Sequence, residues 1–128
     1  MRFLITGGAG FIGCHTARLL RASGHEVRVL DDLSTGRREN LAGLDVELRI
    51  GSIGDPTALG AALAGCERVI HLAAIPGVTP SIRDPVSSDR VNVHGTVALF
   101  AAALRAGVGR VVYASSCAVY GQTAQELA

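Results

Sequence analysis

Short apolar runs alternate along this chain with longer stretches in which apolar residues recur at helical spacing. The short runs are rich in valine, isoleucine and leucine, as buried strands are, and lie at residues 2–6, 26–31, 45–50, 67–72 and 110–114. Helices are expected at residues 11–23, 55–64 and 86–106, with a short helix or turn at 34–42. Strands that alternate with helices predict an α/β fold with a parallel sheet.

Local signals mark where these helices begin and end. Gly24 and Gly107 each follow a helical stretch, and glycine commonly ends a helix there. Pro56 stands at a favoured first helical position, and Ser34 is a candidate N-cap. The side of the first helix expected to face the sheet holds Ile12, Thr16, Leu19 and Leu20. The loop expected before the last helix holds Pro76, Pro80 and Pro85.

The order of these elements predicts one Rossmann-type domain. Right-handed crossovers between parallel strands favour the strand order 3-2-1-4-5 in a doubly wound sheet with helices on both faces. A chain of 128 residues is one domain by length, and it buries roughly two-thirds of its unfolded surface. No repeat or linker interrupts residues 1–128, so we expect a single domain.

Composition and charge exclude several other classes of protein. Hydrophobic residues make up 48% of the chain and charged residues 18%, which indicates a globular protein. The net charge is +1 and the basic residues are scattered, so neither nucleic acid nor an anionic membrane is an expected partner. No apolar run reaches the roughly 20 residues of a membrane span. Three cysteines without a CxxC pattern predict reduced thiols in a cytoplasmic protein, and no metal site is expected from the cysteine and histidine spacing.

A glycine-rich turn stands directly after the first predicted strand, where residues 7–13 read Gly-Gly-Ala-Gly-Phe-Ile-Gly. Gly7 allows a tight turn, Gly10 lets the backbone approach a pyrophosphate, and Gly13 lets the helix pack closely on the strand. The N–H groups at the start of the helix then face the anion. The alternative is a glycine-rich turn without a ligand. We favour a dinucleotide site because Asp31 closes the second strand 18 positions after Gly13, where an acidic residue can bind the adenosine ribose.

The acidic pair at the end of the second strand bears on which dinucleotide binds. A carboxylate at Asp31 accepts hydrogen bonds from the ribose hydroxyls and repels a 2′-phosphate, so NAD is favoured over NADP. Arg37 and Arg38 could in principle hold that phosphate, but they lie several residues further on. Asp32 fits a solvated turn residue or cap better than a ligand, and it is kept as a candidate cofactor contact.

Two later segments hold further candidates. Leu72, Ala73 and Ala74 follow the fourth strand, where small residues let a cofactor approach or simply pack. His71 fits a hydrogen-bonded structural histidine better than a catalytic one. Asn92 lies in the last helix, which disfavours asparagine. Its amide is expected to tie neighbouring loops or reach the cofactor, with surface exposure as the alternative.

The fifth strand is followed by Ser115 and Ser116. Hydroxyl groups at this end of such a sheet lie in the catalytic crevice, although two serines after a strand also serve as a turn or helix cap. Cys117 has no neighbouring base that its spacing identifies, so a reactive thiol is not expected.

Together these motifs resemble the extended short-chain dehydrogenase/reductase family, and within it the NAD-dependent sugar-nucleotide epimerases and dehydratases. The matching blocks run in order along essentially the whole chain: ITGGAGFIG at 5–13, VLDDLSTG at 29–36, HLAA at 71–74, PSIRDP at 80–85, VNVHGT at 91–96 and SSCAVYG at 115–121. The cofactor-binding residues consistent with this resemblance are Gly7, Gly10, Phe11, Ile12, Gly13, Asp31, Asp32, Leu72, Ala73, Ala74 and Asn92.

The resemblance also assigns roles to three other positions. Ser52 and Ile53 stand where the family has an Asp-Ile or Asp-Val pair around the adenine. Serine departs from that pattern, and because its hydroxyl still accepts a hydrogen bond, adenine recognition is expected to be weaker or mediated by water. Ser116, four residues before Tyr120, matches the catalytic Ser/Thr that hydrogen-bonds the reacting sugar oxygen.

The same resemblance favours an epimerase over a dehydratase, because Ser116-Cys117-Ala118 stands where dehydratases carry Thr-Asp-Glu. The family's base is a tyrosine in a Tyr-x-x-x-Lys motif, but this chain has no lysine. Cys117 and Ala124 stand four residues after Tyr113 and Tyr120. Without the lysine charge that lowers the tyrosine pKa, no base is poised to take a hydroxyl proton.

We therefore expect an NAD-binding N-terminal part of a nucleotide-sugar epimerase that is inactive alone. The intact enzyme would act on a nucleotide sugar, and a homo-oligomer is an open possibility. Three alternatives remain: a stand-alone NAD(H)-binding or interaction module, a dehydratase or reductase of the same family, and a structural domain without a ligand.

Overall fold

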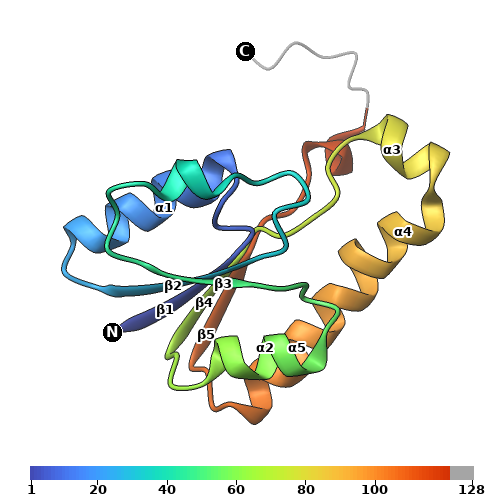
Figure 1. Cartoon of the computed structure of the whole chain (residues 1–128). Helices are drawn as coiled ribbons and strands as arrows, with labels where there is room; N and C mark the ends of the chain where they lie inside the picture. Colours follow the sequence, from blue (N-terminus) through green and yellow to red (C-terminus); the bar gives the residue numbers. More distant parts are fainter. Residues whose placement is uncertain (122–128) are drawn as a thin grey trace.

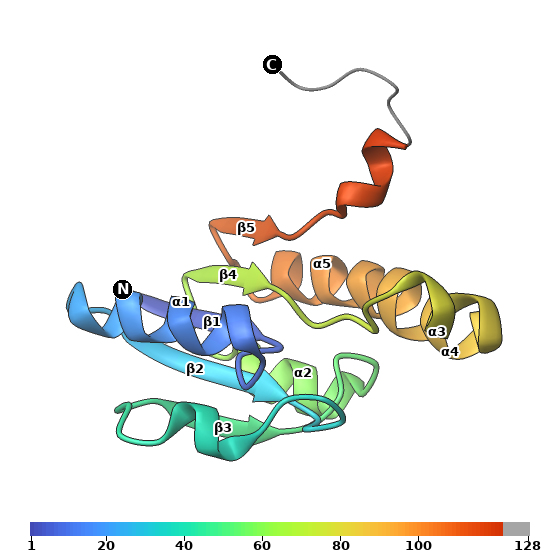
Figure 2. The same ribbon diagram turned by 90° about the horizontal axis from the view of Figure 1, so that it is seen from above.

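The computed structural model describes residues 1–121. Its centre is a five-stranded parallel sheet in the order β3-β2-β1-β4-β5, which confirms the predicted topology. Figure 2 shows the strands side by side in that order. The strands are β1 (Arg2–Thr6), β2 (Glu26–Asp31), β3 (Glu47–Ile50), β4 (Arg68–His71) and β5 (Arg110–Tyr113).

Helices cover both faces of the sheet, with α1 on one face and α2 and α5 on the other (Figure 1). The α-helices are α1 (Phe11–Ala22), α2 (Pro56–Leu63), α3 (Val78–Arg83), α4 (Pro85–Asp89) and α5 (Thr96–Arg105). Three other helical segments are the 3₁₀ turns η1 (Arg38–Leu41) and η3 (Cys117–Tyr120) and the π-helix η2 (Arg90–Gly95). No helix among residues 1–121 is long and apolar enough to cross a membrane.

The proline-rich region differs most from the prediction. The expected loop contains α3, in which Pro80 is the third residue; proline is tolerated in a first turn because its N–H would lack an intrahelical partner there. The expected helix at 86–106 begins at Pro85, because the Asp84 side chain caps it by accepting from the Ser87 amide, and it passes through η2 before α5. The other predicted strand and helix bounds match the structure or differ from it by at most two residues, except that the short helix at 34–42 shrinks to η1.

The predicted inner face of α1 was wrong for Ile12 and Leu19, whereas Leu20 does pack against the core. Its buried residues are Gly13, Cys14 and Ala17, whereas Ile12 and Leu19 are 64% and 70% exposed. The reason is close packing at the start of the helix. A Cβ on Gly13 would lie only 2.4 Å from the Gly7 carbonyl oxygen, so the first turns of the helix present small residues to the sheet.

Alternating strand residues form one core on each face of the sheet. Leu4, Leu30 and Val69 pack with α2 and α5, while Ile5 and Val29 pack with α1. A pattern of this kind buries both faces of the central strands, as a parallel sheet requires.

One charged side chain is buried in the α2 face. Arg28 of β2 is 7% exposed, and its Nη1 donates to the carbonyl oxygens of Ala62 and Ala64, both at 2.8 Å, at the end of α2. Its Nε donates to Glu47 at 2.7 Å, and this hydrogen bond holds the pKa of the Glu47 carboxyl below its ordinary value. Arg28 thus pairs carbonyl groups that the helix leaves free at its end.

Replacing Arg28 by methionine is expected to lower the free energy of unfolding by about 2 kcal/mol, because buried carbonyl groups lose their donors. Urea denaturation measures the change. Arg49→Met is the matched control, since Arg49 bonds to the half-exposed Glu47 and such surface pairs contribute about 0–1 kcal/mol. Equal effects of the two variants would contradict a capping role for Arg28.

Candidate functional site

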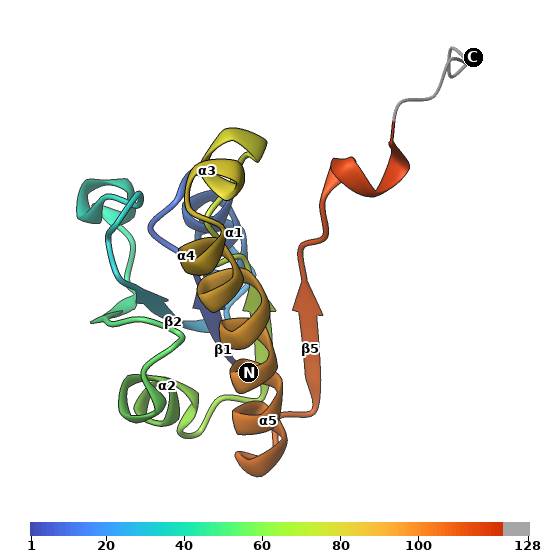
Figure 3. The ribbon, with the colours of Figure 1, turned by 90° about the vertical axis from the view of Figure 1, so that its right-hand side faces the viewer.

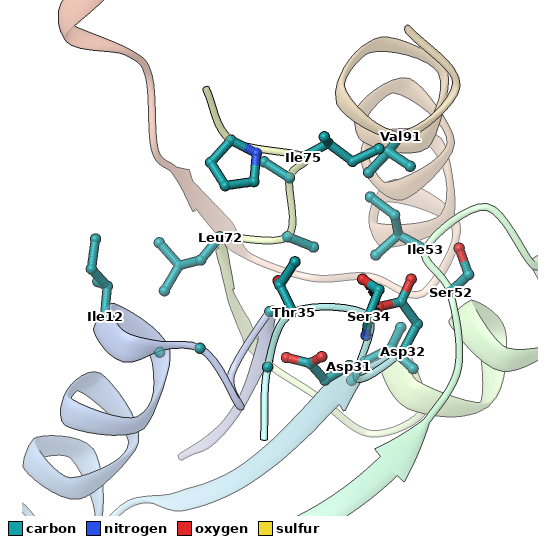
Figure 4. A pocket seen from close by; sticks show the side chains of 18 of the residues that line it. Ile12, Asp31, Asp32, Ser34, Thr35, Ser52, Ile53, Leu72, Ile75 and Val91 are labelled. Carbon is teal, nitrogen blue, oxygen red and sulfur yellow. Dashed lines mark hydrogen bonds between the residues drawn. The ribbon is translucent and has the colours of Figure 1, made fainter. Parts of the chain in front are cut away.

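A cavity of about 390 Å³ opens at the carboxyl ends of the strands, a volume in the usual range for ligand sites. The residue directly after each strand lines it: Gly7, Asp32, Gly51, Leu72 and Ala114. The position is the crevice of an open α/β sheet beside β1 and β4, where the strand order reverses and ligands bind. Figure 4 shows side chains from these loops converging on one space.

The glycine turn forms one wall of the cavity. Gly7 has a left-handed backbone (φ +70°), and a Cβ there would lie 2.7 Å from the Ala73 amide nitrogen. Gly10 precedes α1 without any side-chain cap, so no side chain within residues 1–121 caps the amide groups of the first turn. A Cβ on Gly10 would meet only the Gly7 carbonyl oxygen, at 3.3 Å. Open backbone at the start of a twelve-residue helix fits a bound diphosphate.

Asp31 lies at the end of β2 with its carboxylate fixed in place. Its Oδ2 accepts from the Ala9 amide and its Oδ1 from the Leu33 amide, both at 2.9 Å, and the residue is 7% exposed. Leu33 is the one residue other than glycine with positive φ (59°) among residues 1–121. Each carboxylate oxygen keeps a second lone pair for a ligand hydroxyl, so Asp31 both builds the turn and faces the cavity (Figure 4).

Ala9 joins the glycine turn to the loop after β2. Its carbonyl oxygen accepts from the Arg37 amide at 3.1 Å and from Asn40 Nδ2 at 2.7 Å. Asp32 lies at the rim, and its Oδ1 accepts from both the amide and the hydroxyl of Ser34. Asp32 therefore shapes a turn, as expected, and Ser34 serves that turn instead of capping a helix.

The far end of the cavity is formed by Ser52 and Ile53. Ser52 Oγ accepts from the Gly54 amide at 3.1 Å, which leaves its hydroxyl hydrogen available to a ligand. Ile53 is buried and packs against Gly95, where a Cβ would lie 2.7 Å from the isoleucine Cδ1. The departure from aspartate at position 52 thus replaces a charged acceptor by a hydroxyl that can donate.

The loop after β4 forms another wall of the cavity, beside the glycine turn. Leu72, Ala73 and Ala74 line it together with Ile75. Asn92 is exposed and does not line the cavity. Its Oδ1 accepts from the Ile75 amide at 2.8 Å and its Nδ2 donates to the Ile75 carbonyl at 3.0 Å. The structure thus confirms that the Asn92 side-chain amide ties a neighbouring loop, the one that contains Ile75, and it does not show the amide reaching the cavity.

Beyond Ala114, the segment after β5 leaves this cavity. Ser116 caps η3 by accepting from the Ala118 amide at 3.1 Å and does not line the cavity. Figure 3 shows this segment running away from the sheet. Tyr113 contacts Phe100 edge-on at 5.6 Å between ring centroids, and Tyr120 is 79% exposed. Ala124 lies outside the described residues.

Twelve predicted cofactor residues line one cavity: Gly7, Gly10, Phe11, Ile12, Gly13, Asp31, Asp32, Ser52, Ile53, Leu72, Ala73 and Ala74. Sequence reasoning missed other lining residues, including Thr35, Gly36, Ile75 and Val91. The signal for Gly36 was its place in the VLDDLSTG block. A Cβ there would lie 3.0 Å from both Ala9 and the Asp31 carboxylate. Residues 1–121 contain no group of three or more metal-ligating side chains.

Comparison with known proteins places this geometry in a family. The NAD dependent epimerase/dehydratase family model matches residues 3–127. A UDP-glucose 4-epimerase of Rhizobium meliloti is 40% identical over 92% of this chain and 36% of its own length. One from Klebsiella pneumoniae is 36% identical over 94% of this chain and 93% of its own length.

Solved structures of similar proteins support the same family. The UDP-glucose 4-epimerase of Thermus thermophilus in complex with NAD superposes with a TM-score of 0.85 at 40% identity, covering 91% of this chain and 38% of that one. A dTDP-glucose 4,6-dehydratase from Streptomyces venezuelae with NAD bound gives 0.91 at 41% identity, covering 98% and 42%. The chain thus spans about two fifths of most of these relatives. It belongs to the NAD-dependent epimerase/dehydratase family, as its motifs predicted.

Proposed function

We propose that this chain, residues 1–128, is the NAD-binding part of a nucleotide-sugar epimerase. The observation that carries the proposal is the pairing of uncapped backbone at the start of α1 with the fixed carboxylate of Asp31 across one cavity. The α1 amides would hold the diphosphate and Asp31 the adenosine ribose. Ser52 and Ile53 would flank the adenine, and Leu72 to Ala74 would line the rest of the cofactor. Bound NAD would supply a hydride acceptor for a sugar carbon.

The carboxylates at the cavity rim favour NAD over NADP. Asp31 and Asp32 both line the cavity, whereas Arg37 and Arg38 are exposed and do not. A 2′-phosphate beside two carboxylates is repelled at a cost of several kcal/mol. Calorimetric titration of the purified chain should therefore show NAD⁺ binding on the order of 100-fold tighter than NADP⁺. No heat with NAD⁺ and no thermal shift would refute a dinucleotide site.

Within the family, we propose epimerisation instead of dehydration. Support comes from the segment Ser116-Cys117-Ala118, which contains a hydroxyl group but no acid that could drive water elimination. In this proposal Ser116 is the catalytic residue, and its hydroxyl orients the reacting sugar oxygen. The structural likeness to a dehydratase keeps the second activity as the alternative. A chimera of residues 1–121 with the remainder of the Thermus thermophilus enzyme tests this. Interconversion of UDP-glucose and UDP-galactose supports the proposal, and a 4-keto-6-deoxy product contradicts it.

The 128-residue chain alone is expected to show no turnover. It contains no lysine, and its tyrosines do not line the cavity, so it lacks the tyrosine and lysine pair expected to supply the activated base. An assay of the purified chain with UDP-galactose and NAD⁺ checks this. Measurable epimerisation would require a different base.

A stand-alone module is the second candidate function, because α5 and β5 carry exposed apolar residues. Val97 and Leu104 are 63% and 82% exposed, and Val112 is 55% exposed. Contiguous apolar surface promotes association, so self-association would fit this candidate, and sedimentation velocity measures it.

The three cysteines are free, two of them buried, which supports a cytoplasmic location. The proposed substrate is a nucleotide sugar, without nucleic-acid or membrane partners.

A further inference from the structure

His71 is a buried titratable residue for which the proposed site has no use. It is the last residue of β4 and 5% exposed. Both ring nitrogens have partners: Nδ1 lies 2.6 Å from Thr6 Oγ1 at the end of β1, and Nε2 lies 2.9 Å from Thr96 Oγ1 at the start of α5. The expectation of a hydrogen-bonded structural histidine is confirmed, and its partners give it a more specific role.

The direction of these hydrogen bonds follows from the group at their far end. Thr96 Oγ1 lies 2.8 Å from the Asn92 carbonyl oxygen, which can only accept, so the Thr96 hydroxyl donates there. Thr96 must then accept from an N–H on His71 Nε2. In the neutral ring Nδ1 is consequently an acceptor, and it receives the Thr6 hydroxyl proton. Thr6 Oγ1 in turn accepts from the Ala73 amide through a long bond of 3.4 Å.

The two ends of this hydrogen-bonded chain therefore reach two positions of the loop after β4. At one end it holds the Ala73 amide. At the other it reaches the backbone of Asn92, whose side chain holds both the amide and the carbonyl of Ile75. Ala73 and Ile75 line the cavity, and Ala73 lies so close to Gly7 that no Cβ fits between them. The loop Leu72–Ile75 is thus a cavity wall held at one end by the buried side chains of Thr6 and His71 and at the other by Thr96 and the exposed Asn92.

We propose that neutral His71 is a positioning residue that holds the loop Leu72–Ile75 in place for the dinucleotide by linking Thr6 to Thr96. The effect on NAD rests on the proposed function. The effect on the loop does not. A proton added to Nδ1 would face the Thr6 hydroxyl, which already accepts from Ala73, and the Thr6 proton would lose its acceptor. Acid therefore weakens the attachment of the loop.

The surroundings of His71 favour the neutral ring. Burial lowers the pKa of His71 from its ordinary value of 6.5. Its register partner on β5 is Tyr113. On the helical side, His94 and Asp89 pair with each other at the surface at 2.9 Å, and Arg90 is exposed. Because the unfolded chain takes up the proton first, this stabilisation is complete above about pH 6.5 and is lost as the pH falls through the lowered pKa.

Hydrogen exchange of the protein without ligand tests the positioning role. Thr96→Val removes the acceptor for His71 while keeping the side-chain shape. Exchange at the amides of Ala73 and Ile75 is expected to become roughly five- to tenfold faster, the factor that one or two ordinary hydrogen bonds supply. Thr16→Val is the matched control, since the Thr16 hydroxyl makes the same bond to the carbonyl four residues earlier, on Ile12, without a histidine.

The result for other amides separates positioning from general destabilisation. Faster exchange at Ala73 and Ile75 with unchanged exchange in β1 supports the proposal. Unchanged exchange at both amides, or an equal increase at every amide, overturns it.

The pH dependence of NAD⁺ binding provides the second readout. As the pH falls from 7.5 through the lowered pKa of His71, the wild-type dissociation constant is expected to rise several-fold, while in His71→Phe it stays flat because no group titrates in the network. A parallel rise in both proteins contradicts the proposal. If neither the wild type nor His71→Phe binds NAD⁺ at any pH, the proposed function fails. The hydrogen-exchange experiment then still decides the role of His71.

Discussion

Gly13→Ala is expected to abolish NAD⁺ binding and to lower the free energy of unfolding by about 3 kcal/mol or more. A Cβ at this position would lie 2.4 Å from the Gly7 carbonyl oxygen and 2.5 Å from the Gly8 Cα. Both atoms belong to the backbone of the turn, so relief requires α1 to move away from β1. That movement would displace the amides proposed to hold the diphosphate. Urea denaturation and calorimetric titration measure the two effects.

Gly60→Ala is the matched control for this substitution. Gly60 lies inside α2, and a Cβ there meets no atom within 4 Å. Alanine is preferred over glycine within a helix by roughly 0.5–1 kcal/mol, so this variant should gain stability and bind NAD⁺ normally. If Gly13→Ala behaved like Gly60→Ala, the close packing of α1 on the glycine turn would not matter for the fold or for the site.

Asp31→Ala is expected to have the second largest effect. The buried amide of Ala9 and the partly buried amide of Leu33 lose a charged acceptor, and hydrogen bonds to charged groups contribute about 1.5–3 kcal/mol each. We expect a loss of about 3 kcal/mol in unfolding free energy. NAD⁺ affinity is expected to fall on the order of 100-fold, because the proposed ribose ligand is gone. Chemical denaturation and titration report the two losses separately.

Two further variants separate charge from simple truncation. Asp31→Asn keeps one acceptor oxygen and should fall between wild type and alanine in both measurements. Asp45→Ala removes a carboxylate whose side chain is 91% exposed and pairs with Arg21 at the surface, so it should change stability by less than about 1 kcal/mol. NAD⁺ affinity unchanged in Asp31→Ala would remove the carboxylate from the proposed site.

Much of the site was accessible to prediction because its residues are close in sequence or stand at strand ends. The glycine spacing in residues 7–13 leaves few ways for a strand to pass into a helix. Parallel strands bring their carboxyl ends to one edge, so Asp31, Ser52 and Leu72 had to lie near the turn once the strand order was right.

Other features depend on contacts between distant residues. The apolar pattern of α1 pointed to Ile12 and Leu19, but the tight approach at Gly13 decided which side faces the sheet. In the sequence Arg28 is an ordinary charged residue of a strand. Its role depends on the carbonyl groups at the end of α2, which only the fold brings beside it.

The amino-acid sequence by itself determined the alternation of elements, the sheet order, the glycine turn and the family, because these depend on local periodicity and on short motifs. Only the tertiary structure decided which groups pair in the interior. Thr6 and His71 are 65 positions apart, and Thr96 follows another 25 later. No local signal links them. Their hydrogen bonds form because the register of β1 with β4 and the packing of α5 bring these side chains together, where burial requires each polar group to find a partner.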